Sequence, residues 1–120
     1  MISKEVELYN CIRNDDIDTV KSLLEGGADV QSAFFWGVEY LNEHIINLSL
    51  DYGADIHAEE DYALRWSTTS SFYNVVQLLL ERGANVHAKD DEALRHSVLC
   101  GFNNKEIVQL LLDHGADVHA

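Results

Sequence analysis

Histidines recur along the sequence at a spacing that could place metal ligands in register. His57, His87 and His119 each stand four residues after a glycine, at one point of a repeated phrase. Equivalent residues of stacked repeats lie on the order of 10 Å apart, whereas a zinc ion needs its nitrogen ligands at about 2.0–2.1 Å. We therefore expect these histidines to form structural hydrogen bonds, and we expect no metal site.

Two acidic clusters could serve acid–base chemistry or bind calcium. They are Glu59, Glu60 and Asp61 and, one repeat later, Asp90, Asp91 and Glu92. Neither cluster has the alternating spacing of acids found in a calcium-binding loop. The sequence also shows no nucleophile beside an activating base, no phosphate-binding glycine loop and no zinc hydrolase motif. We expect these acidic side chains to be solvated, the protein not to be an enzyme, and no cofactor to bind.

The composition excludes several classes of partner. Eight lysines and arginines stand against 21 acidic residues, which gives the 120-residue chain a net charge of -13. Such a chain repels phosphate backbones and anionic lipid headgroups, so direct nucleic-acid and membrane binding are disfavoured. Charges among the first 20 residues exclude a signal-peptide core, and no stretch is apolar enough to span a bilayer. With 47% apolar residues we expect one soluble globular unit in the cytoplasm, with Cys11 and Cys100 as reduced thiols.

The sequence is built from repeats. Glycine, alanine, an acid or amide, and an aliphatic residue follow one another at 27–30, 53–56, 83–86 and 115–118. Each copy follows a run with apolar residues at i, i+3 and i+4, which is typical of a helix, and its glycine suits a left-handed C-cap. A second phrase, at 33–37, 63–67 and 93–97, has leucine or phenylalanine three residues before a small residue. This spacing predicts a first helix packed tightly on a second, so each unit should be two antiparallel helices and a connecting finger.

The unit endings EIVQLLLDHGADVHA and NVVQLLLERGANVHA resemble the helix-to-finger signature of ankyrin repeats, and the resemblance covers essentially the whole chain. It implies an all-α fold, an ankyrin-repeat solenoid of about four helix-turn-helix repeats with short connecting fingers. The repeats span approximately 1–30, 31–58, 59–88 and 89–120 of a single domain, residues 1–120. The ALRxS phrase and the short fingers are similar to the divergent ankyrin repeats of giant DNA viruses, which would place the protein in a host cytoplasm.

The turn before the first helix departs from the ankyrin pattern. The TPLH phrase of the family is replaced by YALR and EALR, so the usual bracing of this turn is missing. Arg65 and Arg95 occupy the site of the family's histidine. Because arginine makes two-pronged contacts with carboxylates, we expect both to pair with Asp61, Asp90 or Asp91 rather than with a carboxylate of a partner.

The two ends of the array differ in polarity. In the first unit Thr19 and Ser22 replace apolar residues of the later second helices, which caps that side. At the other end Leu111 and Leu112 remain apolar, and exposing such side chains forgoes roughly 1.5–3 kcal/mol each. The sequence therefore predicts self-association through this face, a partner on it, or further residues after it.

Positions late in each first helix vary while the framework repeats, and the family usually exposes them on its concave face. They are Arg13 and Asn14, Glu39 and Tyr40, Thr69 and Ser70, and Leu99 and Cys100. The expected partner-binding set also contains Tyr52, Arg82, Glu59, Glu60, Asp61, Asp90 and Asp91. Tyr40, Tyr52 and Leu99 are the expected anchors. Trp36 and Trp66 are expected in the core rather than in an aromatic binding site.

The resemblance implies a protein–protein interaction module that holds a partner on its concave face and acidic finger edge. Residues 1–60 carry 13 acids and 3 bases, against 8 acids and 5 bases in residues 61–120, so the partner should present a basic surface. The alternative is an acidic decoy that occupies the positively charged groove of a nucleic-acid-handling enzyme or a host defence protein. A third interpretation is purely structural, as a fragment of a longer array or an oligomer.

Overall fold

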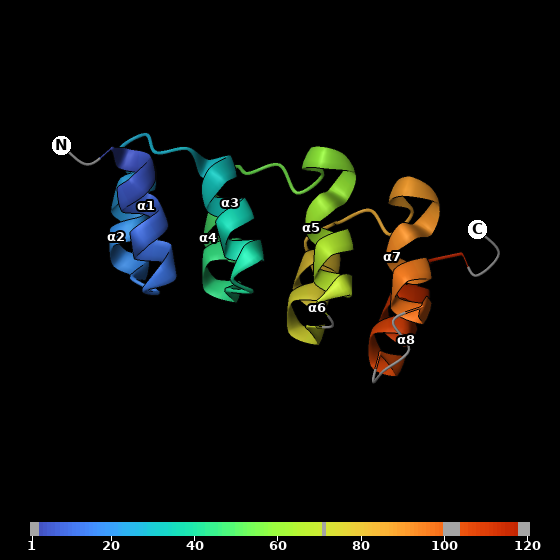
Figure 1. The fold of residues 1–120 in the computed structure, drawn as a ribbon. Coiled ribbons are helices and arrows are strands. Elements are labelled where there is room, and N and C mark those ends of the chain that lie inside the picture. Colours follow the sequence, from blue (N-terminus) through green and yellow to red (C-terminus); the bar gives the residue numbers. More distant parts are fainter. Residues whose placement is uncertain (1–2, 71, 100–103, 118–120) are drawn as a thin grey trace. The chain divides into compact units, whose positions relative to one another are not determined.

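The computed structural model describes residues 3–70, 72–99 and 104–117 (Figure 1). The described residues form helices, turns and loops without a strand, which confirms the all-α prediction. The eight helices follow one another as four antiparallel pairs. The pairs are α1 (Lys4–Arg13) with α2 (Ile17–Glu25), α3 (Val30–Glu39) with α4 (Glu43–Asp51), α5 (Ala58–Thr69) with α6 (Tyr73–Glu81), and α7 (Ala88–Leu99) with α8 (Lys105–Asp113).

The chain divides into two compact units, residues 1–55 with α1–α4 and residues 56–120 with α5–α8. We call α1, α3, α5 and α7 the first helices and their partners the second helices. In the first unit α1 packs against α3 and α2 against α4, over a core that includes Leu8, Ile12 and Ile45. In the second unit α5 packs against α7 and α6 against α8, with Leu64 and Leu79 buried.

Each second helix ends at the glycine that the sequence predicts. Gly27, Gly53, Gly83 and Gly115 all have φ between 95° and 100°, a left-handed conformation that glycine adopts without a Cβ clash. At the first of these ends the Gly27 amide donates to the Leu24 carbonyl and the Ala28 amide to the Leu23 carbonyl. These bonds satisfy carbonyls that the helix leaves unpaired, so the C-cap prediction is confirmed.

The two helices of a pair approach closely at the small residue of the first helix. A Cβ added to Gly37 would lie 2.9 Å from Ile45 Cγ2, so this position of α3 accepts no larger residue without a shift. The equivalent Ser67 and Ser97 are buried, and their hydroxyls donate to the Leu64 and Leu94 carbonyls. The prediction of tight packing between first and second helices is confirmed.

A left-handed turn precedes the regular part of α5 and of α7. Glu59, Glu60 and Asp61 have φ of 55–56°, and Lys89, Asp90 and Asp91 have φ of 54–58°. A left-handed conformation costs a non-glycine residue roughly 1–2 kcal/mol. The turn therefore needs hydrogen bonds that stabilise it. The helix α3, which begins directly at Val30, has no such left-handed turn.

Arginine holds the carbonyls of each left-handed turn. Arg65 donates from Nε to the Glu60 carbonyl (3.0 Å) and from Nη2 to the Glu59 carbonyl (2.8 Å). Arg95 makes the same two bonds to the carbonyls of Asp90 and Lys89, at 3.0 and 2.9 Å. The expectation that these arginines pair with Asp61, Asp90 or Asp91 is therefore wrong. Both guanidinium groups bind backbone oxygens of the turn, and the carboxylate that Arg65 contacts is that of Glu92.

A buried carboxylate joins each left-handed turn to the finger that follows. Asp61 is 3% exposed and accepts the Asn85 amide at 2.7 Å and His57 Nδ1 at 3.0 Å. Because an ionised carboxylate only accepts, His57 carries its proton on Nδ1. The expected structural hydrogen bond of this histidine is thus confirmed, whereas the expectation that Asp61 is solvated is wrong.

The same arrangement recurs in the last pair of helices. Asp91 is 4% exposed, accepts the Asp117 amide at 2.7 Å and binds His87 Nδ1 at 3.1 Å. Its expected solvation is also wrong, and the role predicted for His87 is confirmed. The third histidine of the series, His119, lies outside the described residues.

In the first unit an amide takes the place of the buried carboxylate. Gln31 donates from Nε2 to the Asp55 carbonyl (3.1 Å), and its Oε1 accepts the Asp55 amide (2.8 Å). Asp55, Asn85 and Asp117 occupy the same position of the repeated phrase, two residues after its glycine. We call these three connections, from Gln31, Asp61 and Asp91, the finger ties.

Removing a finger tie should destabilise the protein. Asp61→Ala leaves the Asn85 amide and the His57 ring without an acceptor, and we expect a loss of about 2 kcal/mol in the free energy of unfolding. Glu60→Ala alters an exposed side chain in the same left-handed turn, so it is the matched control. Its loss in the free energy of unfolding should be at least about 1 kcal/mol smaller than that of Asp61→Ala. Urea unfolding followed by helical circular dichroism measures both; equal losses would contradict the role of the carboxylate.

Candidate functional site

Large apolar side chains are exposed mainly along the first helices. Among the described residues, those that are more than about a third exposed on a first helix or its C-cap are Val6, Trp36, Tyr40, Tyr62, Val98 and Leu99. Phe72, at the N-cap of α6, is exposed as well. Apart from Phe72, the exposed large apolar side chains of the described residues therefore belong to the first helices or their C-caps.

Three aromatic rings meet where α1 packs against α3. The Tyr9 ring contacts the Trp36 ring edge-on, with centroids 4.6 Å apart, and Tyr40 lies nearly parallel to Trp36 at 6.2 Å. The hydroxyl oxygens of Tyr9 and Tyr40 are 2.9 Å apart, and Arg13 lies over the Tyr9 ring at 5.7 Å. The hydrogen bond with Tyr9, helped by partial burial, raises the pKa of Tyr40 above its ordinary value of 10.0. Tyr9, Trp36 and Tyr40 form the aromatic cluster.

A hollow of about 430 Å³ lies beside this cluster. Glu5, Val6 and Tyr9 of α1 line it from one side, and Ser32 and Trp36 of α3 from the other. Trp36 is 37% exposed, so the prediction that it belongs to the core is wrong.

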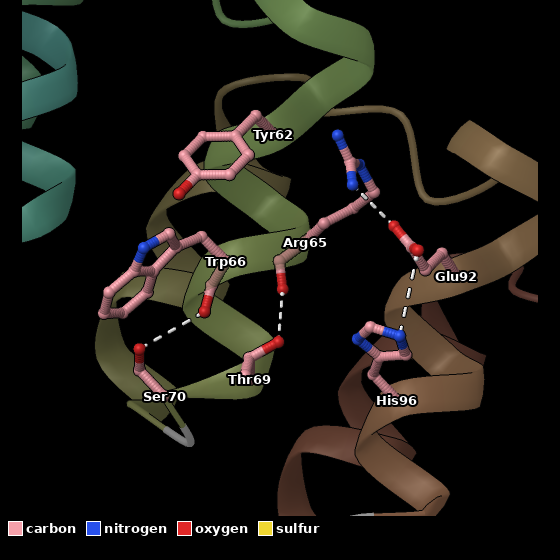
Figure 2. Close-up of a pocket in the computed structure, with 7 residues that line it drawn as sticks. All are labelled: Tyr62, Arg65, Trp66, Thr69, Ser70, Glu92 and His96. Carbon is pink, nitrogen blue, oxygen red and sulfur yellow. Dashed lines mark hydrogen bonds and ion pairs between the residues drawn. The ribbon is translucent and has the colours of Figure 1, made fainter.

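The second unit has a related groove of about 290 Å³ between α5 and α7 (Figure 2). Its walls are Tyr62, Arg65, Trp66, Thr69 and Ser70 of α5 and Glu92 and His96 of α7. Figure 2 shows Trp66 and Tyr62 along one wall and the pair formed by Arg65 and Glu92 along the other. Trp66 is half-buried and lines this groove, so it is not a fully buried core residue either.

An ion pair joins the two helices across this groove. Arg65 Nη1 lies 2.6 Å from Glu92 Oε2, and His96 Nε2 lies 3.8 Å from the other carboxylate oxygen. The hydrogen bond from Arg65 lowers the pKa of Glu92 below its ordinary value of 4.5. Arg65 also lies over the Tyr62 ring at 5.8 Å. The hydroxyls of Thr69 and Ser70 donate to carbonyls of their own helix.

The structure brings only some of the predicted partner-binding residues together. Tyr40 belongs to the aromatic cluster, and Arg13 contacts it. Asn14 and Glu39 are exposed beside them at the ends of α1 and α3. Thr69 and Ser70 line the groove of the second unit. Leu99 is 80% exposed at the end of α7.

The other predicted residues lie on different elements. Tyr52 is the C-cap of α4, where its hydroxyl donates to Glu25 Oε1 of α2 at 2.8 Å, and Arg82 is the exposed C-cap of α6. Both therefore stand on second helices. The acids Glu59, Glu60 and Asp90 are exposed on the left-handed turns, whereas Asp61 and Asp91 are buried and unavailable to a partner. Cys100 lies outside the described residues.

Most residues that line the hollow and the groove were not in the predicted partner-binding set, among them Tyr9 and Glu5. Tyr9 stands four residues before Arg13, so both lie on one face of a helix, and this spacing could have placed it in the predicted set. No sequence pattern indicated Glu5, because its place in the hollow depends on Trp36 from a neighbouring helix.

The expected apolar end of the array is not exposed as predicted. Leu111 is fully buried and Leu112 is half-buried. Ile107 and Leu111 are four residues apart on one face of α8, and both are buried where α8 packs against α7 and α6. In the part of α8 that the structure describes, no large apolar side chain is exposed.

Neither a metal cluster nor a membrane span is found in the described ranges. Within residues 3–70, 72–99 and 104–117, no three histidine, cysteine or acidic side chains are arranged to hold a metal ion. None of the helices described there combines the length and the apolar character that crossing a bilayer requires.

Comparison with known proteins identifies a family. The family model for ankyrin repeats (3 copies) matches residues 8–90 and residues 34–120, and the two matches together extend over most of the chain. In a comparison with curated proteins, none matches the chain.

The Arg65–Glu92 pair should make stability depend on pH. Because the pKa of Glu92 is lowered in the folded protein, its stabilising contribution is present above the unfolded pKa and is lost as pH falls through the folded value. At neutral pH we expect Arg65→Met to cost at least about 1 kcal/mol more than Arg95→Met, which breaks the matching carbonyl bonds without an ion pair. Urea unfolding at several pH values, with NMR titration of the Glu92 carboxyl, measures both effects. If the difference in unfolding free energy between Arg65→Met and Arg95→Met stayed the same below the folded pKa of Glu92, this assignment would be contradicted.

Proposed function

The chain belongs to the ankyrin-repeat family, whose repeats are generally protein–protein interaction modules, and we propose that it binds a partner protein through the exposed side of its first helices. One observation carries the proposal. The aromatic cluster and the groove of the second unit both lie between neighbouring first helices and leave indole or phenol rings exposed. Rigid aromatic side chains are the usual anchors of protein interfaces.

Buried positions keep the same residue type from one repeat to the next and exposed positions do not, which supports this assignment. Positions such as Leu64 and Leu94 repeat and are buried, whereas the equivalent residues Glu39, Thr69 and Leu99 differ in type and are exposed. Ankyrin repeats are in general non-enzymatic scaffolds, and fold alone does not choose the partner. The chemistry of the exposed residues must therefore define it.

The charge of the chain favours a basic partner. Residues 1–55 carry 11 acids against 3 bases, and the exposed acids Glu59, Glu60 and Asp90 add to the acidic edge of the second unit. Complementary charge accelerates encounter more than it adds affinity, and salt screens it. The association rate of the partner should therefore fall as salt concentration rises.

Capture from cells of the source organism or its host tests the proposed surface. Tyr40→Ala removes an exposed ring of the aromatic cluster, and we expect it to weaken retention of a specific protein more than about tenfold. Phe72→Ala removes a ring of similar exposure at the N-cap of α6, so it is the matched control and should retain that protein. Equal retention by both variants, or loss in both, would contradict a surface on the first helices.

A second candidate function is that of an acidic decoy, which the net charge of -13 favours. In this case the acidic surface occupies a nucleic-acid-binding groove of the partner. Competition distinguishes the two functions: a decoy prevents the captured protein from binding nucleic acid, and an adaptor leaves that binding intact. Simultaneous binding of both ligands, measured by fluorescence anisotropy of a labelled oligonucleotide, would eliminate the decoy.

A further inference from the structure

The hollow between α1 and α3 contains an indole that is exposed but held in position. The edge of Tyr9 contacts the Trp36 ring at 4.6 Å, and Tyr40 lies nearly parallel to it at 6.2 Å. Trp36 is still 37% exposed, and Val6, 49% exposed, adds an apolar wall. A ring fixed in this way is a preorganised platform, since a ligand that stacks on it loses little additional side-chain freedom.

The charge lining the hollow is negative. Glu5 is the charged residue among its five lining residues, and in the described part of the chain no hydrogen bond or ion pair engages the Glu5 carboxylate. The nearest lysine in sequence, Lys4, donates its ammonium group to the Gly26 carbonyl at 2.7 Å. The hollow therefore combines aromatic faces with a carboxylate and has no basic side chain in its lining.

The second unit shows which group satisfies this combination. There Arg65 lies over the Tyr62 ring at 5.8 Å and pairs with Glu92 at 2.6 Å, so one guanidinium contacts both an aromatic face and a carboxylate between two first helices. The repeat pattern places Tyr9 at the position of Arg65. The lining of the hollow thus has aromatic rings and an acid without an arginine, since Arg13, which lies over the Tyr9 ring, is not among its lining residues.

We propose that this hollow binds an arginine side chain of a basic partner segment, stacked on Trp36 and paired with Glu5. This inference rests on the proposed function and specifies the chemistry of its partner. A guanidinium is attracted to an indole face and forms two parallel hydrogen bonds with a carboxylate. Lysine offers a compact, strongly hydrated charge that matches this site less well, and an acidic side chain is repelled.

Fluorescence titration of the full chain tests the proposal. Trp66→Phe leaves Trp36 as the single tryptophan, because the chain has two. The probes are three glycine–serine peptides of equal length that carry three arginines, three lysines or three citrullines. Citrulline keeps the size and planarity of arginine without its charge. We expect the arginine peptide to bind at least about fivefold more tightly than the lysine peptide and about tenfold more tightly than the citrulline peptide. Equal affinity for arginine and citrulline would overturn the proposal in favour of plain apolar stacking.

Variants separate this site from general attraction to an acidic protein. The indole should contribute more than phenyl, and phenyl more than an aliphatic group, so affinity for the arginine peptide should fall from wild type through Trp36→Phe to Trp36→Leu. Peptide fluorescence polarisation follows the binding when Trp36 is replaced. Glu5→Gln should weaken binding several-fold, whereas Glu106→Gln, an equal change of charge at an exposed position of α8, should not. Equal effects of Glu5→Gln and Glu106→Gln would overturn the proposal, because bulk charge would then explain the binding.

The capture experiment keeps this inference distinct from the proposed function. Helical circular dichroism and urea unfolding first establish that Trp36→Leu folds as the wild type does. A cellular protein that Trp36→Leu retains and Tyr40→Ala loses would leave the interaction module standing and eliminate the arginine site. Loss of that protein with Trp36→Leu and with Glu5→Gln, but not with Glu106→Gln, is the result we expect.

Discussion

The structure depends on the bond between the start of each first helix and the backbone of the following finger. Helices in a repeat protein bury their apolar stripes only when neighbouring pairs are held in register. Here Gln31 supplies that connection in the first unit, and Asp61 and Asp91 supply it in the second. Because the two aspartate side chains are buried, an unmade bond leaves a desolvated polar group, which is costly.

The left-handed turns follow from the length of the fingers. The fingers that lead into α5 and α7 are longer than the one that leads into α3, and the additional residues form a compact left-handed turn. Arg65 and Arg95 satisfy its carbonyls. Arg65 then reaches a carboxylate of the next first helix, so one side chain connects the geometry of the turn with the groove beside it. Framework and candidate interface are thus linked through the same residue.

Local sequence predicts the framework well. Amphipathic periodicity located the second helices, the glycines marked their ends, and the small residue at Gly37 or Ser67 indicated close helix packing. These features depend on residues within one turn of helix or one hairpin. The hydrogen bonds of His57 and His87 were predicted for a similar reason, since each histidine is only four residues from its buried aspartate.

Features that depend on distant residues were not predicted. The burial of Asp61 is decided by Asn85, and the exposure of Trp36 by the side chains of α1. Three successive left-handed residues without glycine have no recognised sequence signal, so the turn and its arginine bonds were missed. Leu111 was expected at an open surface, but its burial is set by packing on neighbouring helices that a pattern of apolar residues does not specify.

Amide hydrogen exchange followed by NMR tests most directly whether side chains hold the fingers in register. Asp55 and Asn85 are exposed finger residues whose amides are bonded to side chains. If these side chains hold the fingers, both amides exchange slowly, and Gln31→Ala releases Asp55 while Asn85 stays protected. Exchange at both positions as fast as in an unstructured peptide would contradict this role of the side chains.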